Sequence, residues 1–368
     1  MAKEFERAGK RILARFIALF LSKRRITAQE FGRLEVSRLL VIRQHHQMGD
    51  MLLAVPAYRG LRARFGNAKI TLLASPLNAP CVQGNPFVDE VLVLPRKKGL
   101  RGIGDLVRFI AELRSRHFDA AIVLNTVSFS VTSMLLAVAS GARWRTGSTS
   151  GPFGHDLTSR FYHLELPLPP PEKLAAMHES EHNLYPLAAL GVRTADLTSV
   201  FVPPVEDERE CERFITASFG AAGRFIVVHP GAGKPQNVWP GRRYAEAARI
   251  LSKTLGCGVV ATAGSADAAT LAAFLEACVD RPFVVSCPSL GFLGALLKRS
   301  TLTLCNDTGV MHIAGAVGAR CVAVFGPTDP ARWKPVNEAV VAVQGRDGNV
   351  DSVSVDEVVA AASALLGA

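Results

Sequence analysis

The sequence lacks the features that mark several common classes of protein. Its seven cysteines form no C-x-x-C pair and are odd in number, which argues against a disulfide framework and against a thiolate zinc site, and favours a reducing cytoplasm. The longest uncharged run near the N-terminus, FIALFLS, is too short to span a bilayer and precedes no small-residue cleavage site, so we expect neither a transmembrane segment nor a secretory signal. No D-x-D sequence occurs, so a Mg²⁺ clamp on phosphates is not indicated.

The composition is that of a globular protein with more than one core. Of 368 residues, 49% are hydrophobic and 20% are charged, which suits two ordinary domains. The net charge of +10 is uneven, because residues 1–43 hold eleven Lys or Arg and only four Glu. Since the rest is nearly neutral and the basic face has no interleaved aromatics, we do not expect a nucleic-acid partner.

The basic N-terminal stretch has the periodicity of an amphipathic helix. This pattern is typical of an anchor lying in the membrane surface, although such a helix also packs against its own domain, and the sequence leaves both interpretations open. One side of the helix is apolar and is flanked by cations: Phe5, Ile12, Leu13, Phe16, Ile17 and Phe20, beside Lys10, Arg11, Arg15 and Lys23.

From residue 38 onwards, short apolar runs alternate with helical segments. This rhythm predicts an α/β protein with two doubly wound, Rossmann-like halves that face one another across a cleft. The Pro-rich and charge-rich interval that follows LPLPPPEK interrupts it. The expected parts are a basic N-terminal helix region (1–36), an N-terminal acceptor domain (37–180), an interdomain connection (181–222), a C-terminal nucleotide-sugar domain (223–350) and a C-terminal helix (351–368).

The first polar cluster, HHQMGDML, directly follows the opening strand. Gly49 permits a tight turn, and Asp50 then lies at or near a helix N-terminus, facing the expected cleft. Asp is also a common N-cap residue, so a purely structural role stays open for Asp50.

Two further clusters follow strands of the second half. In HPGAGKPQNVWP, Lys234 offers a mobile charge for a phosphate, although an ordinary strand-to-helix turn fits as well. In NDTGVMHIAGA, a helix beginning near Gly309 presents free N–H groups beside Asp307 and Thr308. His312 lies about one turn into that helix and is placed to donate to a diphosphate.

Together, these motifs resemble glycosyltransferase family 9, the lipopolysaccharide heptosyltransferases. The resemblance rests on GD-x-x-L-x-x-P, HPGAG…WP and NDTGVMHIAGAVG…VAVFGPTDPARWKP, and it covers most of residues 38–335. It implies a GT-B fold and inverting transfer of a heptose from an ADP-sugar to a lipid-anchored inner-core oligosaccharide. It also implies a cytoplasmic enzyme that contacts the inner face of the membrane and needs no cofactor or metal.

The resemblance also implies roles for individual residues. Asp50 resembles the catalytic base, Thr308, Gly309 and His312 resemble the diphosphate site, and Asp307 would lie near the donor sugar. Asp267 falls where the family often has an acid for the ribose.

One position departs from the family pattern. Asn237 occupies the place, two residues before Trp239, where a Lys or Arg is usual, so either Lys234 supplies that charge or the leaving-group contact is weaker. An inactive nucleotide-sugar binding protein and a sugar-nucleotide epimerase of similar architecture are the alternatives to a transferase.

Overall fold

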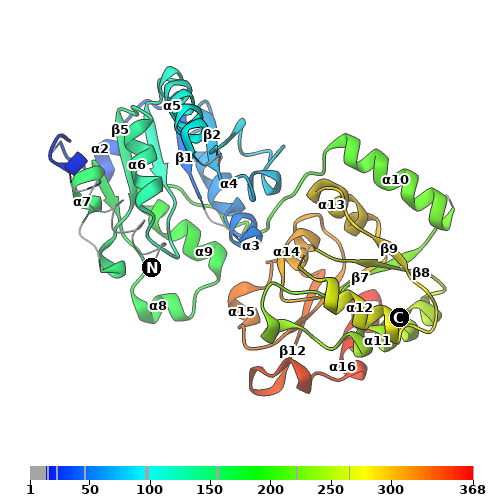
Figure 1. Ribbon diagram of the computed structural model, residues 1–368. Coiled ribbons are helices and arrows are strands. Elements are labelled where there is room, and N and C mark those ends of the chain that lie inside the picture. The colour runs from blue at the N-terminus through cyan, green and yellow to red at the C-terminus, as the bar shows by residue number, and fades with distance from the viewer. Residues whose placement is uncertain are drawn as a thin grey trace. The chain divides into compact units, whose positions relative to one another are not determined.

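The computed structural model describes residues 14, 16–21, 24–44, 47–95, 99–154, 157–220, 223–264 and 266–367. The chain divides into two compact units, residues 1–46 with 54–197 and residues 47–53 with 198–368. Figure 1 shows the helices and strands of each unit. Within the described parts of the chain, no helix is both long enough and apolar enough to cross a membrane.

The first unit contains a six-stranded parallel sheet in the order β3-β2-β1-β4-β5-β6. Its strands are buried apolar runs, as expected for a sheet covered on both faces. They are β1 (Arg38–Ile42), β2 (Lys69–Ala74), β3 (Glu90–Val93), β4 (Ala120–Val123), β5 (Trp144–Ser148) and β6 (Leu164–Leu166). The helices of this unit are α2 (Ala28–Gly32), α4 (Val55–Arg64), α5 (Gly99–Ser115), α6 (Val131–Ala139), α7 (Thr158–Phe161), α8 (Pro171–Ala175) and α9 (Glu179–Leu184).

The second unit repeats this plan with the order β12-β11-β10-β7-β8-β9. Its strands are β7 (Phe225–His229), β8 (Gly258–Thr262), β9 (Phe283–Val285), β10 (Leu302–Asn306), β11 (Cys321–Phe325) and β12 (Val340–Gln344). Its helices are α3 (Met48–Leu52), α10 (Val205–Phe219), α11 (Gly241–Leu255), α12 (Ala268–Ala277), α13 (Leu290–Arg299), α14 (Gly309–Ala316), α15 (Pro330–Trp333) and α16 (Val355–Leu366).

Both sheets have the strand order of the Rossmann fold. In each, the chain starts at a central strand, adds two further strands outward on one side, and returns to the other side of the starting strand. In the second unit this reversal falls between β7 and β10, which pair in parallel from Leu302 opposite Ile226 to Cys305 opposite His229. The predicted fold class of two doubly wound α/β units is therefore confirmed.

Helix signals in the sequence explain several boundaries of the second unit. The helix α16 begins with a capping box in which Ser354 and Glu357 satisfy each other's backbone N–H groups. The helix α11 follows Pro240 and ends at Gly256, whose φ of 59° is left-handed. Between these helices and the sheet, Trp239 is fully buried and its ring meets that of Tyr244 edge to face, 4.7 Å between centroids.

One helix-like run of the sequence is divided in the structure. The run MLLAVPAYRGLRARFG, residues 51–66, predicts a single helix, and this prediction is wrong because the chain forms α3, a turn at residues 53–54, and then α4. Pro56 explains the restart of the helix, since proline has no N–H to donate and is accommodated in a first helical turn. The break leaves α3 as a separate element that belongs to the second unit.

Candidate functional site

The predicted donor residues gather at one edge of the second sheet. Lys234 follows β7, Asp267 follows β8, and Asp307 and Thr308 follow β10, and these three strands are neighbours in the sheet. In a parallel sheet all such loops emerge at the carboxyl ends of the strands. The reversal between β7 and β10 lies among them, and this is where open α/β sheets bind their ligands.

Asn306, the last residue of β10, fixes the loop after β7 to this edge. Its Nδ2 donates to the carbonyl oxygens of Pro230, at 2.9 Å, and Gly231, at 3.1 Å. Its Oδ1 accepts a hydrogen bond of 2.9 Å from the backbone N–H of Trp239. Because Asn306 is fully buried, these bonds are shielded from water and hold the HPGAG and WP turns in one place.

The N-terminus of α14, where the sequence predicts a diphosphate site, has no side-chain cap. Thr308, its N-cap residue, is extended, with φ −152° and ψ 171°, and its side chain makes no capping hydrogen bond. The first backbone N–H groups of this eight-residue helix therefore receive no side-chain acceptor from the cap. These N–H groups, together with the positive end of the helix dipole, favour the binding of a phosphate at this position.

His312 of α14 packs against the segment that carries Asp50. A Cβ atom built on Gly49 would lie 2.6 Å from both Cδ2 and Nε2 of His312, so only glycine allows this approach. A Cβ atom on Gly309 would likewise lie 3.1 Å from the Sδ atom of Met48. The segment around Gly49 and the start of α14 at Gly309 are 260 residues apart in the chain. They are nevertheless in direct contact within the second unit.

Asp50 itself is a helix residue with 7% of its surface exposed. The N-cap residue of α3 is Gln47, so Asp50 does not occupy the cap position that a structural role would favour. The end of α3 is tied to the unit by Ser199, whose hydroxyl donates to the carbonyl of Leu52 at 2.7 Å. Two residues further, the N–H of Phe201 donates to the carbonyl of Ala316 at the end of α14.

Asp267 is held by neighbouring protein groups. One of its oxygens accepts a 2.8 Å hydrogen bond from the N–H of Gly264 and lies 3.5 Å from Nε2 of His229. The other ring nitrogen of His229, Nδ1, lies 3.1 Å from Oγ1 of Thr262. Burial lowers the pKa of His229 and Asp267 opposes this effect. A Cβ atom on Gly231 would lie 2.1 Å from Cγ of Asp267, so this glycine makes room for the carboxylate.

Asp307 is a partly buried carboxyl group with several protein partners. Burial raises its pKa, while hydrogen bonds from Thr328 and Asn237 and the positive charge of Lys234 act in the opposite direction. Nδ2 of Asn237 donates to Oδ2 of Asp307 at 2.9 Å. The sequence shows that Asn237 is not basic, but neither this bond nor the contacts of Asn306 can be read from it.

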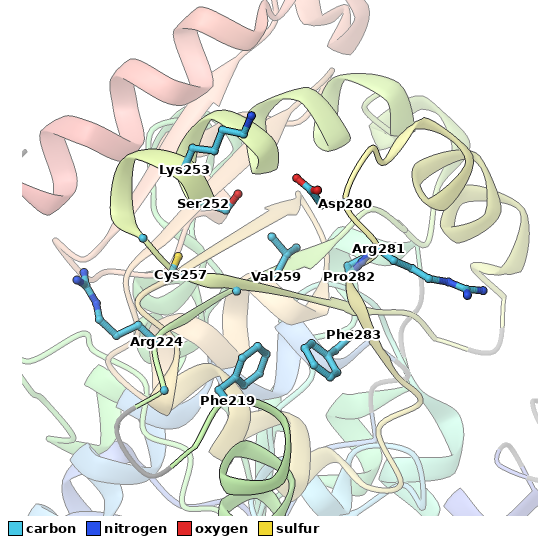
Figure 2. A pocket seen from close by; sticks show the side chains of 13 residues that line it. Phe219, Arg224, Ser252, Lys253, Cys257, Val259, Asp280, Arg281, Pro282 and Phe283 are labelled. Atoms are coloured by element: carbon cyan, nitrogen blue, oxygen red, sulfur yellow. The ribbon is translucent and has the colours of Figure 1, made fainter.

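Among the residues that the structure describes, no cluster of three or more His, Cys, Asp or Glu side chains is placed to hold a metal ion. A groove of about 720 Å³ opens elsewhere, at the amino ends of β7, β8 and β9 (Figure 2). Phe219, Val259 and Phe283 form part of its wall, and Arg224, Lys253 and Arg281 are the cations that line it. Because it lies at the opposite end of the sheet, it does not include the predicted donor residues.

The Rossmann strand order in both units defines a two-unit α/β protein of the GT-B type. The model of glycosyltransferase family 9 (heptosyltransferase) matches residues 106–358. Lipopolysaccharide heptosyltransferase 3 of Escherichia coli (strain K12) is 25% identical over 300 residues, which are 80% of this chain and 84% of that protein.

Two solved structures share the fold over most of their length. A family 9 glycosyl transferase from Veillonella parvula DSM 2008 has a TM-score of 0.78 and 22% identity, and the match covers 91% of this chain and 99% of that chain. The ADP-heptose lps heptosyltransferase II of Escherichia coli has a TM-score of 0.71 and 23% identity, with 89% and 98% covered. The chain belongs to glycosyltransferase family 9, as its motifs predict, and is a glycosyltransferase.

Proposed function

We propose that the protein transfers a heptose, or a related sugar, from an ADP-sugar to an inner-core sugar of lipopolysaccharide with inversion at the anomeric carbon. The observation that carries this proposal is the contact between Gly49 and His312. This contact brings α14, at whose uncapped N-terminus a diphosphate would bind, against Gly49. Gly49 directly precedes Asp50, the proposed base. The family membership and the ADP-heptose named for one of the solved structures support the choice of donor.

The proposed reaction is a single displacement. The acceptor hydroxyl oxygen forms a bond to the anomeric carbon, Asp50 takes the hydroxyl proton, and the bond from the anomeric carbon to the phosphate oxygen breaks. The bonding electron pair leaves with the nucleoside diphosphate. Its charge is stabilised by the N–H groups at the start of α14, by His312 and by Lys234, while Asp307 lies on the sugar side. No metal takes part in the proposed step.

A lipid-anchored acceptor would place the enzyme at the inner face of the cytoplasmic membrane. Most of the predicted amphipathic helix, including Phe5, Ile12 and Leu13, lies outside the described residues. In its described part, Ala14 and Ala18 are buried in the core of the first unit. Phe16, Leu19 and Phe20 are 59%, 70% and 76% exposed. One side of this segment thus packs on the unit, and its exposed aromatic side supports a contact with the membrane surface.

A panel of ADP- and UDP-sugars tests the proposal. The full chain is incubated with each donor, and thermal stabilisation, hydrolysis and transfer to a heptose-deficient lipopolysaccharide are scored. We expect the ADP-sugars to stabilise the protein, by about 2.7 kcal/mol at one hundred times Kd, and ADP-heptose to be consumed only with acceptor. Binding without transfer would instead identify an inactive binding protein, and conversion of the donor without acceptor would identify an epimerase.

A further inference from the structure

The helix α5 carries more apolar surface than its own unit covers. Phe109 and Leu113, on its inner side, are buried in a core of the first unit. Ile103, Leu106 and Val107 are 61%, 40% and 62% exposed, and they lie on one face because helix residues three or four apart are neighbours. These three side chains are called the α5 patch below. An exposed apolar face on a helix that is already packed on its unit indicates a further contact.

The α5 patch belongs to the same layer of helices as the exposed N-terminal side chains. Figure 1 shows α5 beside α6 on one face of the first sheet, and α6 in turn contacts α7. Arg25, which follows the N-terminal segment, donates a hydrogen bond to the carbonyl oxygen of Ser159 in α7. One core cluster lies under this layer, and it includes residues of α5 together with Ala14 and Ala18. The layer therefore exposes apolar side chains in two places, the α5 patch and residues 16–20.

The charges around the α5 patch suit an anionic surface. The helix and the three residues before it, 96–115, contain six Lys or Arg and only two acids, Asp105 and Glu112. Arg108, directly after Val107, is strongly exposed. Apolar side chains flanked by cations are typical of helices that lie in the surface of an anionic membrane. A second copy of this chain on the same patch would bring like charges together, so the charge favours lipid over self-association.

We propose that the α5 patch contacts an anionic lipid bilayer and inserts Ile103, Leu106 and Val107 at the level of the headgroups, while residues 16–20 insert at the second place on the same layer. A few inserted side chains bind a bilayer weakly, and two such contacts on one body bind far more tightly than either alone. Neither contact therefore holds the protein by itself. The inference rests on the proposed function, whose lipid-anchored acceptor requires a bilayer, and it identifies the face of the first unit that lies against the lipid.

Vesicle sedimentation of a double variant tests the α5 patch by loss of binding. The full chain is mixed with vesicles that contain phosphatidylglycerol, and Ile103→Gln/Val107→Gln should bind about tenfold more weakly than wild type, because two apolar side chains no longer enter the lipid. The matched control, Val205→Gln/Val279→Gln, replaces two side chains of the second unit that are more than half exposed, and it should bind like wild type. Thermal unfolding checks that both variants are folded.

A tryptophan placed in the α5 patch reports insertion directly. In Val107→Trp, brominated lipid chains should quench the added fluorescence, since an indole ring settles at the boundary between headgroups and acyl chains. In the control Val205→Trp, quenching should stay at the level of the wild-type chain. Added salt should weaken the binding of the wild-type chain to these vesicles, because it screens the attraction between the cations and the lipid phosphates.

The outcomes are distinguishable. Unchanged vesicle affinity of Ile103→Gln/Val107→Gln, or quenching of Val107→Trp no stronger than that of Val205→Trp, would overturn the role of α5 and leave the proposed function standing. A wild-type dimer that the double variant breaks up in sedimentation velocity would make the patch an interface between copies and would also overturn the inference. Failure of the wild-type chain to bind ADP and every ADP-sugar would instead overturn the proposed function, whereas the vesicle measurements need no nucleotide.

Discussion

Replacing Gly49 with alanine is the sharpest steric test of the candidate site. The added Cβ atom would lie 2.6 Å from Cδ2 and Nε2 of His312. Carbon atoms in contact prefer about 3.5 Å or more, so the ring or α3 must move by about 1 Å. His312 is only 6% exposed, which leaves little room for a rotation that would avoid the clash.

A displacement of this size has two measurable consequences. Overpacking in a buried contact costs about 1–3 kcal/mol of unfolding free energy. A reacting group moved by about 1 Å reduces turnover by about a hundredfold, because alignment of the base with the substrate is lost. We therefore expect Gly49→Ala to lower kcat for transfer from ADP-heptose far more than its modest loss of thermal stability accounts for.

The matched control is Gly60→Ala in α4. Its added Cβ atom would lie 2.8 Å from Cγ1 of Val192, a comparable clash between residues that are not in the candidate site. This variant should lose stability and keep its turnover at a temperature where it is folded. If Gly49→Ala turns over like wild type while Gly60→Ala is destabilised as expected, the contact with His312 has no part in catalysis.

Three other perturbations test separate parts of the reasoning. Asp50→Asn should reduce transfer by about two to four orders of magnitude and leave ADP affinity intact, and normal turnover would place the base elsewhere. Asn306→Ala leaves two carbonyl oxygens and one N–H group without their buried hydrogen-bond partner. The variant should therefore unfold at a lower temperature and bind ADP more weakly. Unchanged ADP affinity would show that the loop after β7 is held by other contacts. Replacement of the exposed Phe16, Leu19 and Phe20 with serine, which leaves the buried Ala14 and Ala18 in place, should shift the protein from sedimenting with anionic vesicles to the supernatant without loss of the folded state, and continued sedimentation would refute the membrane contact.

The fold follows from sequence patterns that act locally. Buried apolar runs separated by helical periodicities specify parallel α/β units, and glycine and proline positions mark the turns. Helical periodicity on both sides of Pro56 favours one continuous helix, but the proline lies in the first turn of α4 and marks the place where the helix begins again.

The site is only partly visible in the sequence. Residues that follow strands were found because parallel strands bring their carboxyl ends together, and this covers Lys234, Asp307 and Thr308. The contact of Gly49 with His312 depends on tertiary packing over a long sequence separation, which no local pattern encodes. Asn306 ends an apolar run, and a buried polar residue at the end of a strand is the signal that could have identified it.

The partly buried carboxyl group of Asp307 makes the stability of the protein depend on pH. Burial raises its pKa above the ordinary 3.8, so its neutral form suits the folded state better than its ionised form. The stabilisation that folding gains from the neutral carboxyl group is therefore complete below pH 3.8 and is lost as the pH rises through the raised pKa.

The substitution Asp307→Asn keeps the shape of the side chain and an oxygen for Asn237, but it removes the charge. This variant should unfold at a higher temperature than wild type at pH 7 to 8, and the difference should shrink as the pH falls towards 4. At the same time it should lose transfer activity, because the proposed reaction places the charge of Asp307 on the sugar side of the donor. A variant that is less stable than wild type at pH 8, or a difference that grows on acidification, would show that the buried charge is well accommodated and would contradict this account of Asp307.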